Sequence, residues 1–345
     1  MIDAKWAIFT DLHLGVHQNS SSWHKIALDW ADWFIEDLKK RNISNIIFTG
    51  DFFHSRSEIS VSTIHAAAEF ISKFVDFDIK MLVGNHDSYY KQKADIHSLS
   101  ILNGYSNIHV YDTVTNTEIN GKKVCFCPWG FEYDKIKKSD ILFGHFEIET
   151  FKMNAHKLCE VGSKPKDLLK KAPLVFSGHF HLNEERRYDE GTIVYVGSPF
   201  QLDFGERDCK KGYYLFDFDS LGYEFVENNQ SSTHKKILLS DILVEGKVDE
   251  GRLELLHNNF IKLVVDVNVD QKIVDNLVHL INSKSPASIT VDPLVSYDIM
   301  DQENTDLSGV DIGNAIVEFV NLLDIKEKEA VIKRTLELYN QAKHG

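Results

Sequence analysis

The chain has 345 residues, 43% of them hydrophobic and 26% charged, which is typical of a globular protein large enough for more than one domain. A formal net charge of −14 excludes a protein that coats nucleic acid by bulk electrostatic attraction. It leaves open an enzyme that acts on phosphodiesters, because bound cations reverse the charge of a carboxylate cluster. No apolar run reaches the roughly eighteen residues of a membrane span, and no signal-peptide pattern precedes the first strand, so we expect a cytoplasmic protein.

The first part of the chain alternates predicted strands and helices. Residues 4–16 begin with a strand, and polar residues after it predict a loop. Apolar residues at helical spacing follow from Trp23 to Leu38 and again from about Thr63 to Phe74. Short apolar runs at 46–49 and 80–83 predict the next two buried strands. This alternation predicts layers of helices and strands.

Beyond residue 105 the pattern changes to short strands joined by turns. Asn120-Gly121 is typical of a hairpin turn between two of them. The polar segment 228–232 predicts a linker, and we place the end of the first domain, 1–230, there. The predicted strands lie within 108–111, 114–119, 123–127, 141–145, 174–181, 193–196 and 212–217.

The rest of the chain predicts two smaller parts. Residues 235–297 read as a small α/β unit with a strand at 261–269, a helix at 271–283 and a strand at 288–291. Residues 298–345 begin with an acidic linker and continue with apolar residues on one helical stripe between 312 and 339.

Five segments share one layout, in which a predicted strand is followed at once by residues that bind metal ions. Carboxylates at the carboxyl ends of buried strands lie where open α/β sheets hold their ligands. Mixed imidazole and carboxylate ligands favour manganese, iron or zinc over magnesium or calcium. Asp51 can bridge two ions, because its carboxylate has two oxygens, and such a pair can stabilise both the attacking and the leaving oxygen of a phosphoryl group. The segments are Asp11-Leu12-His13, Gly50-Asp51-Phe52-Phe53-His54, Gly84-Asn85-His86-Asp87, Gly144-His145 and Gly178-His179-Phe180-His181.

The order of these motifs resembles that of the calcineurin-like metallophosphoesterase superfamily. The resemblance implies a mixed α+β and α/β fold, a two-sheet sandwich flanked by helices, here with a small capping domain and a C-terminal helical tail. It implies two divalent ions, and we expect manganese. The first ion would be held by Asp11, His13, Asp51 and His181, and the second by Asp51, Asn85, His145 and His179.

The same resemblance assigns roles to three residues that do not bind the ions. His86 matches the position that approaches the leaving oxygen as the general acid. His54 matches a position that supports the phosphate or positions His86, and Asp87 would orient His86 from behind.

The segments at 11–15, 50–54 and 197–206 resemble most the SbcD-type branch of DNA-repair nucleases. Those at 94–99 and 144–148 are similar to the small, nuclease subunits of tailed-phage recombination endonucleases. The resemblance implies exonuclease action on duplex DNA ends and endonuclease action on single strands, in DNA recombination, replication and repair. For a phage-encoded chain, the compartment would be the host cytoplasm.

The resemblance also implies partners. Residues 235–297 would cap the nuclease domain and position DNA, and 312–339 would dock on the coiled coil of an SMC-like ATPase subunit. A homodimer through the helices at Trp23–Leu38 and Thr63–Phe74 is implied as well, although we interpret their apolar residues first as core. The alternatives left open are packing of 312–339 on its own domain, a phosphatase or phosphodiesterase with a non-DNA substrate, and a metal-free interaction scaffold.

Overall fold

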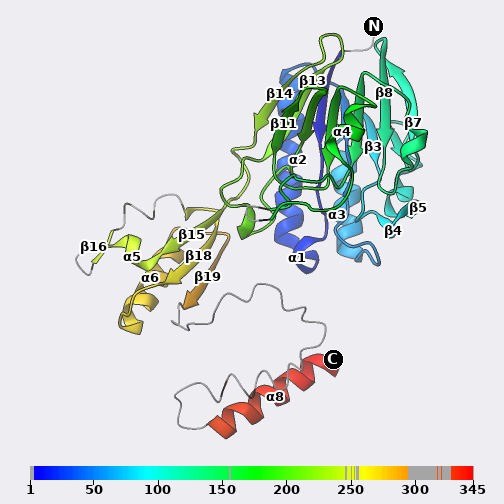
Figure 1. Cartoon of the computed structure of the whole chain (residues 1–345). Helices are drawn as coiled ribbons and strands as arrows, with labels where there is room; N and C mark the ends of the chain where they lie inside the picture. The colour runs from blue at the N-terminus through cyan, green and yellow to red at the C-terminus, as the bar shows by residue number, and fades with distance from the viewer. Residues whose placement is uncertain are drawn as a thin grey trace. The chain divides into compact units, whose positions relative to one another are not determined.

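The computed structural model of the chain describes residues 4–154, 157–244, 247–249, 251, 253, 256–293, 317, 320 and 328–344 (Figure 1). It divides into two compact units, Met1–Leu294 and Val295–Gly345. The second unit contains the helix α8, Lys328–His344. The predicted acidic linker from residue 298, and most of the stripe before 328, lie outside the described residues. No described helix is both long and apolar enough to cross a membrane.

Two six-stranded sheets form the body of the first unit (Figure 1). Their central strands run parallel. Antiparallel strands close both edges of the second sheet and one edge of the first, whose other edge strand, Ile108–Tyr111, is parallel to its neighbour. The first sheet has the order β14 (Gly222–Glu227), β13 (Gly212–Asp217), β1 (Lys5–Phe9), β2 (Asn45–Phe48), β3 (Asp78–Leu82) and β6 (Ile108–Tyr111). The second has the order β11 (Glu184–Tyr188), β12 (Gly191–Tyr195), β10 (Leu174–Gly178), β9 (Ile141–His145), β8 (Lys122–Cys127) and β7 (Thr115–Ile119).

The two-residue repeat of β1 shows how the sheets and helices pack. Trp6 and Ile8 point into a core shared with Phe143 of the second sheet. The alternate side chain, Phe9, lies in the core under the helices, where its ring centroid is 5.0 Å from that of Trp30. Because one face of the sheet meets the other sheet and the opposite face meets helices, the fold is the predicted two-sheet sandwich flanked by helices. That prediction is confirmed.

Two long helices, α2 (Ser21–Lys40) and α3 (Val61–Ser72), cover the first sheet. The apolar stripe of α2 is buried, as expected of core residues, whereas Val61 and Ile64 of α3 are 85% and 46% exposed. The predicted loop after β1 contains one short turn, α1 (Val16–Asn19), with left-handed backbone at three residues. The shorter elements are β4 (Ser88–Tyr90), β5 (Lys93–His97), α4 (Pro165–Leu169) and the 3-10 turns Ser98–Leu102, Tyr133–Lys135 and Phe204–Glu206.

The part of the first unit after residue 233 has its own sheet and core. Three parallel strands, β15 (His234–Leu238), β18 (Phe260–Val265) and β19 (Ser288–Pro293), pack against α6 (Gln271–Ser283). The helix has the predicted bounds, and Asp270 caps it by accepting a hydrogen bond from the backbone N–H of Lys272. The remaining elements are α5 (Leu239–Ile242), β16 (Leu243–Val244) and β17 (Lys247–Val248).

Candidate metal centre

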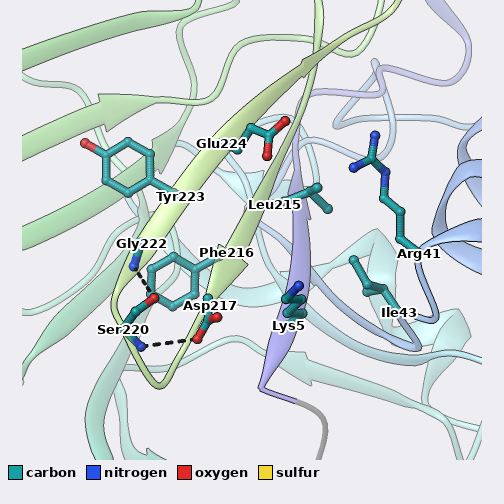
Figure 2. A pocket seen from close by; sticks show the side chains of 10 residues that line it. All are labelled: Lys5, Arg41, Ile43, Leu215, Phe216, Asp217, Ser220, Gly222, Tyr223 and Glu224. Atoms are coloured by element: carbon teal, nitrogen blue, oxygen red, sulfur yellow. Dashed lines mark hydrogen bonds between the residues drawn. The ribbon is translucent and has the colours of Figure 1, made fainter.

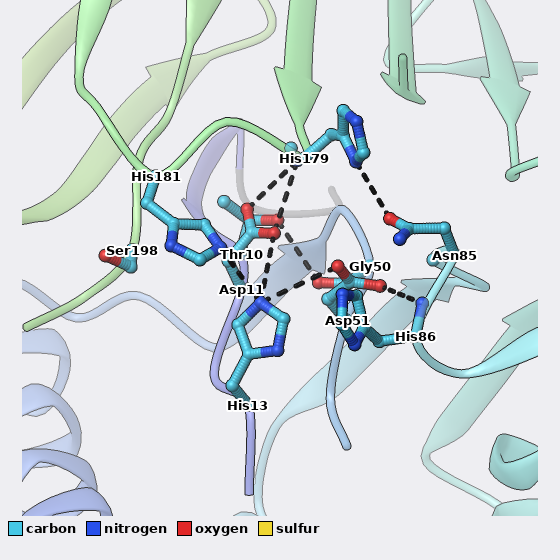
Figure 3. Close-up of polar contacts among 12 residues, drawn as sticks. Thr10, Asp11, His13, Gly50, Asp51, Asn85, His86, His179, His181 and Ser198 are labelled. Atoms are coloured by element: carbon cyan, nitrogen blue, oxygen red, sulfur yellow. Dashed lines mark hydrogen bonds and ion pairs between the residues drawn. The ribbon is translucent and has the colours of Figure 1, made fainter. Parts of the chain in front are cut away.

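The predicted ligands lie at the carboxyl ends of five parallel strands, two of them in the second sheet (Figure 3). Asp11, Asp51 and Asn85 follow β1, β2 and β3 of the first sheet. His145 is the last residue of β9, and His179 directly follows β10. Because the two sheets pack face to face, strand ends from both sheets meet at one edge of the sandwich.

The first cluster consists of Asp11, His13 and His181, whose ligand atoms lie within 4.8 Å of one another. The Nε2 atoms of His13 and His181 are 3.0 Å apart. His13 Nε2 is also 3.8 Å from Asp11 Oδ1 and 3.6 Å from Asp51 Oδ2. The other ring nitrogen of His13 is buried and has no hydrogen-bond partner among the described residues. Two facing imidazole nitrogens beside two carboxylates are the donor set of a cation site.

The second cluster consists of Asp51, His145 and His179. His145 Nε2 lies 3.3 Å from Asp51 Oδ2. His145 Nε2 and His179 Nδ1 each lie 2.8 Å from the side-chain oxygen of Asn85. Asp51 therefore touches histidines of both clusters, as a bridging carboxylate would.

Strained backbone and two glycines hold these ligands close together. Asp11, His13, Asp51 and His179 have positive φ angles of 52°, 49°, 61° and 92°, a conformation that is uncommon for residues other than glycine. A Cβ atom on Gly84 would lie 2.1 Å from Asp51 Oδ1, and one on Gly50 would lie 2.4 Å from His145 Nδ1. The glycines that precede ligands in the sequence motifs are required because the ligands pack directly on them.

The charges of the cluster fit divalent cations. Burial opposes ionisation of Asp51, but His145 and His13 hold the pKa of its carboxyl below the ordinary value. Burial likewise opposes a charge on His145, yet Asp51 raises the pKa of His145 to about 9. Burial and the neighbouring His145 lower the pKa of His179 to about 3. A cation bound here would take the place of the proton on His145, since imidazole binds metals in its neutral form.

His54 and His86 lie beside the first cluster. Their rings stack with centroids 5.5 Å apart and an interplanar angle of 21°. His86 Nδ1 donates to the backbone carbonyl of His54 at 2.5 Å, and the backbone N–H of His86 donates to Asp51 Oδ1 at 2.7 Å. His86 is partly exposed and His54 is exposed, so this pair lies on the side of the centre that a substrate can reach.

Asp87 is placed differently from the expectation that it orients the His86 ring. Its buried carboxylate accepts hydrogen bonds of 2.9–3.0 Å from backbone N–H groups of Asp51, Phe52, Phe53 and Gly84. Burial and the nearby Asp51 raise the pKa of Asp87 to about 7. Since these amides occupy the carboxylate and the His54 carbonyl holds the His86 ring, the expected role is corrected. Asp87 positions the loop that carries Asp51.

Comparison with known proteins identifies the family. The model of the calcineurin-like phosphoesterases matches residues 4–192, more than half of the chain. The chain belongs to this family. This phosphoesterase is 30% identical over 350 residues to Exonuclease subunit 1 of Enterobacteria phage T4, with 96% of this chain and 97% of the relative covered. A solved structure described as a novel archaeal phosphodiesterase matches with a TM-score of 0.37 and 15% identity, over 65% of this chain and 99% of that one. The chain is a hydrolase of phosphodiester bonds.

One residue of the phosphoesterase site was missed by sequence reasoning. Glu206 accepts a hydrogen bond from His181 Nδ1 at 2.8 Å, which directs Nε2 of that ring toward His13. Lys211, which is 4% exposed, lies 2.7 Å from Glu206 and donates to the carbonyl of His181 and to Ser198 Oγ, each at 2.7 Å. Burial opposes ionisation of Glu206, but these two partners hold its pKa at about 2. The only sequence signal was its place in the 197–206 segment.

A hollow of about 440 Å³ has none of the predicted ligands in its lining. Figure 2 shows the residues that line it. It is lined by Lys5, at the start of β1, whereas Asp11 follows the opposite end of that strand. Arg41, which also lines it, is paired with Asp37 at 2.7 Å. The hollow therefore contributes no residue to the metal centre.

Proposed function

We propose that this phosphoesterase is a metal-dependent DNA nuclease, acting as an exonuclease on duplex ends and as an endonuclease on single strands. The observation that carries the proposal is the pair of ligand clusters sharing Asp51, with the His54–His86 pair on the accessible side. The relative's name, an exonuclease subunit, supports DNA as the substrate, and the alignment extends over almost all of both chains.

Divalent cations, for which we propose manganese, would be held by Asp11, His13, Asp51 and His181 and by Asp51, Asn85, His145 and His179. Bound there, they supply Lewis-acid stabilisation to the oxygens of the phosphodiester. The residues of the chain complete the reaction. His86 Nδ1–H donates to the His54 carbonyl, which orients the ring, and Nε2–H of the imidazolium form would give its proton to the leaving oxygen.

We further propose roles for the domains around this centre and for the partners that they bind. Residues 1–230 form the nuclease domain, 235–297 cap it and position DNA, and 298–345 bind an SMC-like ATPase through the stripe at 312–339. The described part of that stripe lies mainly in α8, and the word subunit in the relative's name supports a partner chain. The exposed Val61 and Ile64 of α3 are the residues that we propose for homodimer contact. Recombination and repair of DNA ends, in the host cytoplasm if the chain is phage-encoded, is the proposed setting.

The test compares wild type with Asp51→Ala on an end-labelled linear duplex and on a single-stranded circle, each with manganese and with EDTA. The proposal predicts cutting of both DNAs that requires manganese and is lost in the variant. If the wild type, with or without the ATPase partner, turns over a small phosphodiester ester but cuts neither DNA, the substrate is not DNA and the proposal is wrong.

A further inference from the structure

Two exposed tyrosines lie just after the motif Gly84-Asn85-His86-Asp87 in the sequence. The hairpin of β4 and β5 begins at Ser88, directly after Asp87. Tyr89 and Tyr90 are 54% and 45% exposed, and their ring centroids lie 5.0 Å apart at 78°. Exposed large aromatic side chains that occur together on a surface mark an interaction site more often than isolated ones do. Lys91 and Lys93, both exposed, follow in the same hairpin.

The hairpin is held in place beside the metal centre. Ser88 Oγ donates to the carbonyls of Tyr90, at 3.0 Å, and of Lys93. At the tip, Trp129 Nε1 donates to the carbonyl of Lys91 at 2.8 Å. The ring of Trp129 in turn lies against His179, with centroids 5.1 Å apart. The tyrosines are therefore attached to a rigid support that includes a metal ligand, as a pre-organised binding surface requires.

The distance along the chain limits how far the tyrosines lie from the reacting phosphate. Consecutive Cα atoms are about 3.8 Å apart. Tyr89 is three residues after His86, so the Cα atoms of these two residues are at most about 11 Å apart. Neighbouring nucleotides of one strand rise by about 3.4 Å in a duplex and more when the strand is extended. The start of the hairpin therefore lies within about three nucleotide steps of His86.

Aromatic rings beside basic residues are the features by which proteins bind unpaired nucleic acid strands. Every base has a π-face, so stacking does not depend on sequence, and lysines can neutralise the backbone between stacked bases. A small phosphodiester or a phosphoprotein has no run of bases that could stack on two adjacent rings. A duplex offers no free base face except at an opened end.

We propose that Tyr89 and Tyr90 form a base-stacking platform for unpaired nucleotides next to the cleaved phosphate, with Lys91 and Lys93 contacting the backbone. This inference rests on the proposed nuclease function. It assigns to the hairpin the selection of single strands and opened duplex ends. The platform acts through binding and takes no part in bond cleavage.

The test uses the full chain in manganese buffer and a fluorescent single-stranded oligonucleotide with phosphorothioate linkages. The Tyr89→Ala/Tyr90→Ala variant is expected to bind about tenfold or more weakly, because each lost stacking contact accounts for roughly that factor. The Tyr89→Phe/Tyr90→Phe variant should bind as wild type, since stacking needs the ring and not the hydroxyl. Tyr105→Ala, at a tyrosine that is 39% exposed outside the hairpin, is the matched control and should have no effect.

The kcat for bis(p-nitrophenyl) phosphate is measured on all variants, and it should be unchanged because neither tyrosine belongs to the ligand clusters or to the His54–His86 pair. The stacking proposal is overturned if the alanine pair binds the oligonucleotide as tightly as wild type, or if ester turnover falls in parallel with binding. In the first of these cases the wild type still cuts DNA and the nuclease function stands. If the wild type neither binds nor cuts DNA, the nuclease function itself fails, and the two failures are thus distinguishable.

Discussion

The buried pair of Glu206 and Lys211 provides the sharpest test of how the centre is supported. Lys211 uses all three of its donors, on Glu206, on Ser198 and on the carbonyl of His181. Glu206 also accepts from His181 Nδ1 and from the backbone N–H of Leu202 at 2.9 Å. The pair therefore fixes both the ring and the backbone of a metal ligand. Changing either partner leaves the other as a buried charge.

The magnitude follows from this burial. Removing one partner of a buried ion pair costs about 3–5 kcal/mol, because the other charge stays buried and unpaired; replacing both partners by neutral groups leaves no such charge and does not double the cost. Glu206→Gln and Lys211→Met each retain the approximate shape of the side chain and remove its charge. We expect each single variant to lose about 3 kcal/mol of unfolding free energy. The double variant should lose about the same rather than twice as much, a coupling of about 2–3 kcal/mol.

Two assays check these values. Urea unfolding of wild type, both single variants and the double variant gives the coupling energy. Calorimetric titration with manganese gives the affinity of each site, and Glu206→Gln should weaken one of two binding steps by about 10- to 100-fold. The weakened step is the one at Asp11, His13 and His181. Additive losses of stability, or equal affinities in wild type and Glu206→Gln, would show that the pair does not support His181.

Three further predictions follow from the same structure. Gly84→Ala should abolish manganese binding measured by calorimetry, because its Cβ would lie 2.1 Å from Asp51 Oδ1, while Gly104→Ala, with nothing within 4 Å, should bind normally. Burial lowers the pKa of His234 to about 4 in the folded chain. As the pH falls below 6.5, the unfolded chain binds the proton before the folded chain does. The contribution of His234 to the unfolding free energy is therefore full above pH 6.5 and is lost as the pH drops toward 4. His234→Phe should remove about 1–2 kcal/mol of that loss at pH 5 in urea unfolding, and an unchanged pH slope would contradict this. Manganese at 100 times its dissociation constant should stabilise the wild type by about 2.7 kcal/mol for each site and stabilise Asp51→Ala less; equal shifts in thermal unfolding would argue against binding at this centre.

The strands that end at the metal centre and the ligand positions could be predicted because both are local properties of the sequence, whereas Glu184–Tyr188 and Gly222–Glu227, at the sheet edges, were not predicted. A buried strand needs an apolar run, and a ligand at its end needs a glycine to pack against. Each short motif therefore indicates both the strand and the ligand that follows it. Parallel strands then bring the motifs to one edge whatever the sheet order. The helix at 271–283 was equally local, since its cap and its apolar spacing lie within the same residues.

The supporting contacts could not be predicted because they join residues that are distant in the sequence. Glu206 meets His181 across 25 residues, and no spacing rule connects a glutamate in a 3-10 turn with a histidine after a strand. Asp87 was predicted to orient its sequence neighbour His86, but the hydrogen bonds to its carboxylate come from backbone amides. The sequence pattern of side chains does not indicate such contacts. The pairing of β1 with β13, more than two hundred residues later, is another case.

The most direct test of the central claim measures metal content and DNA cleavage on the same preparations of wild type, Asp51→Ala and His86→Ala. The wild type and His86→Ala should each hold two manganese ions, since His86 is not among the ligands, while Asp51→Ala should hold fewer. Only the wild type should cut DNA at full rate, because His86→Ala lacks the proton donor. Full cleavage by His86→Ala, or cleavage by a wild type that holds no metal, would contradict the account.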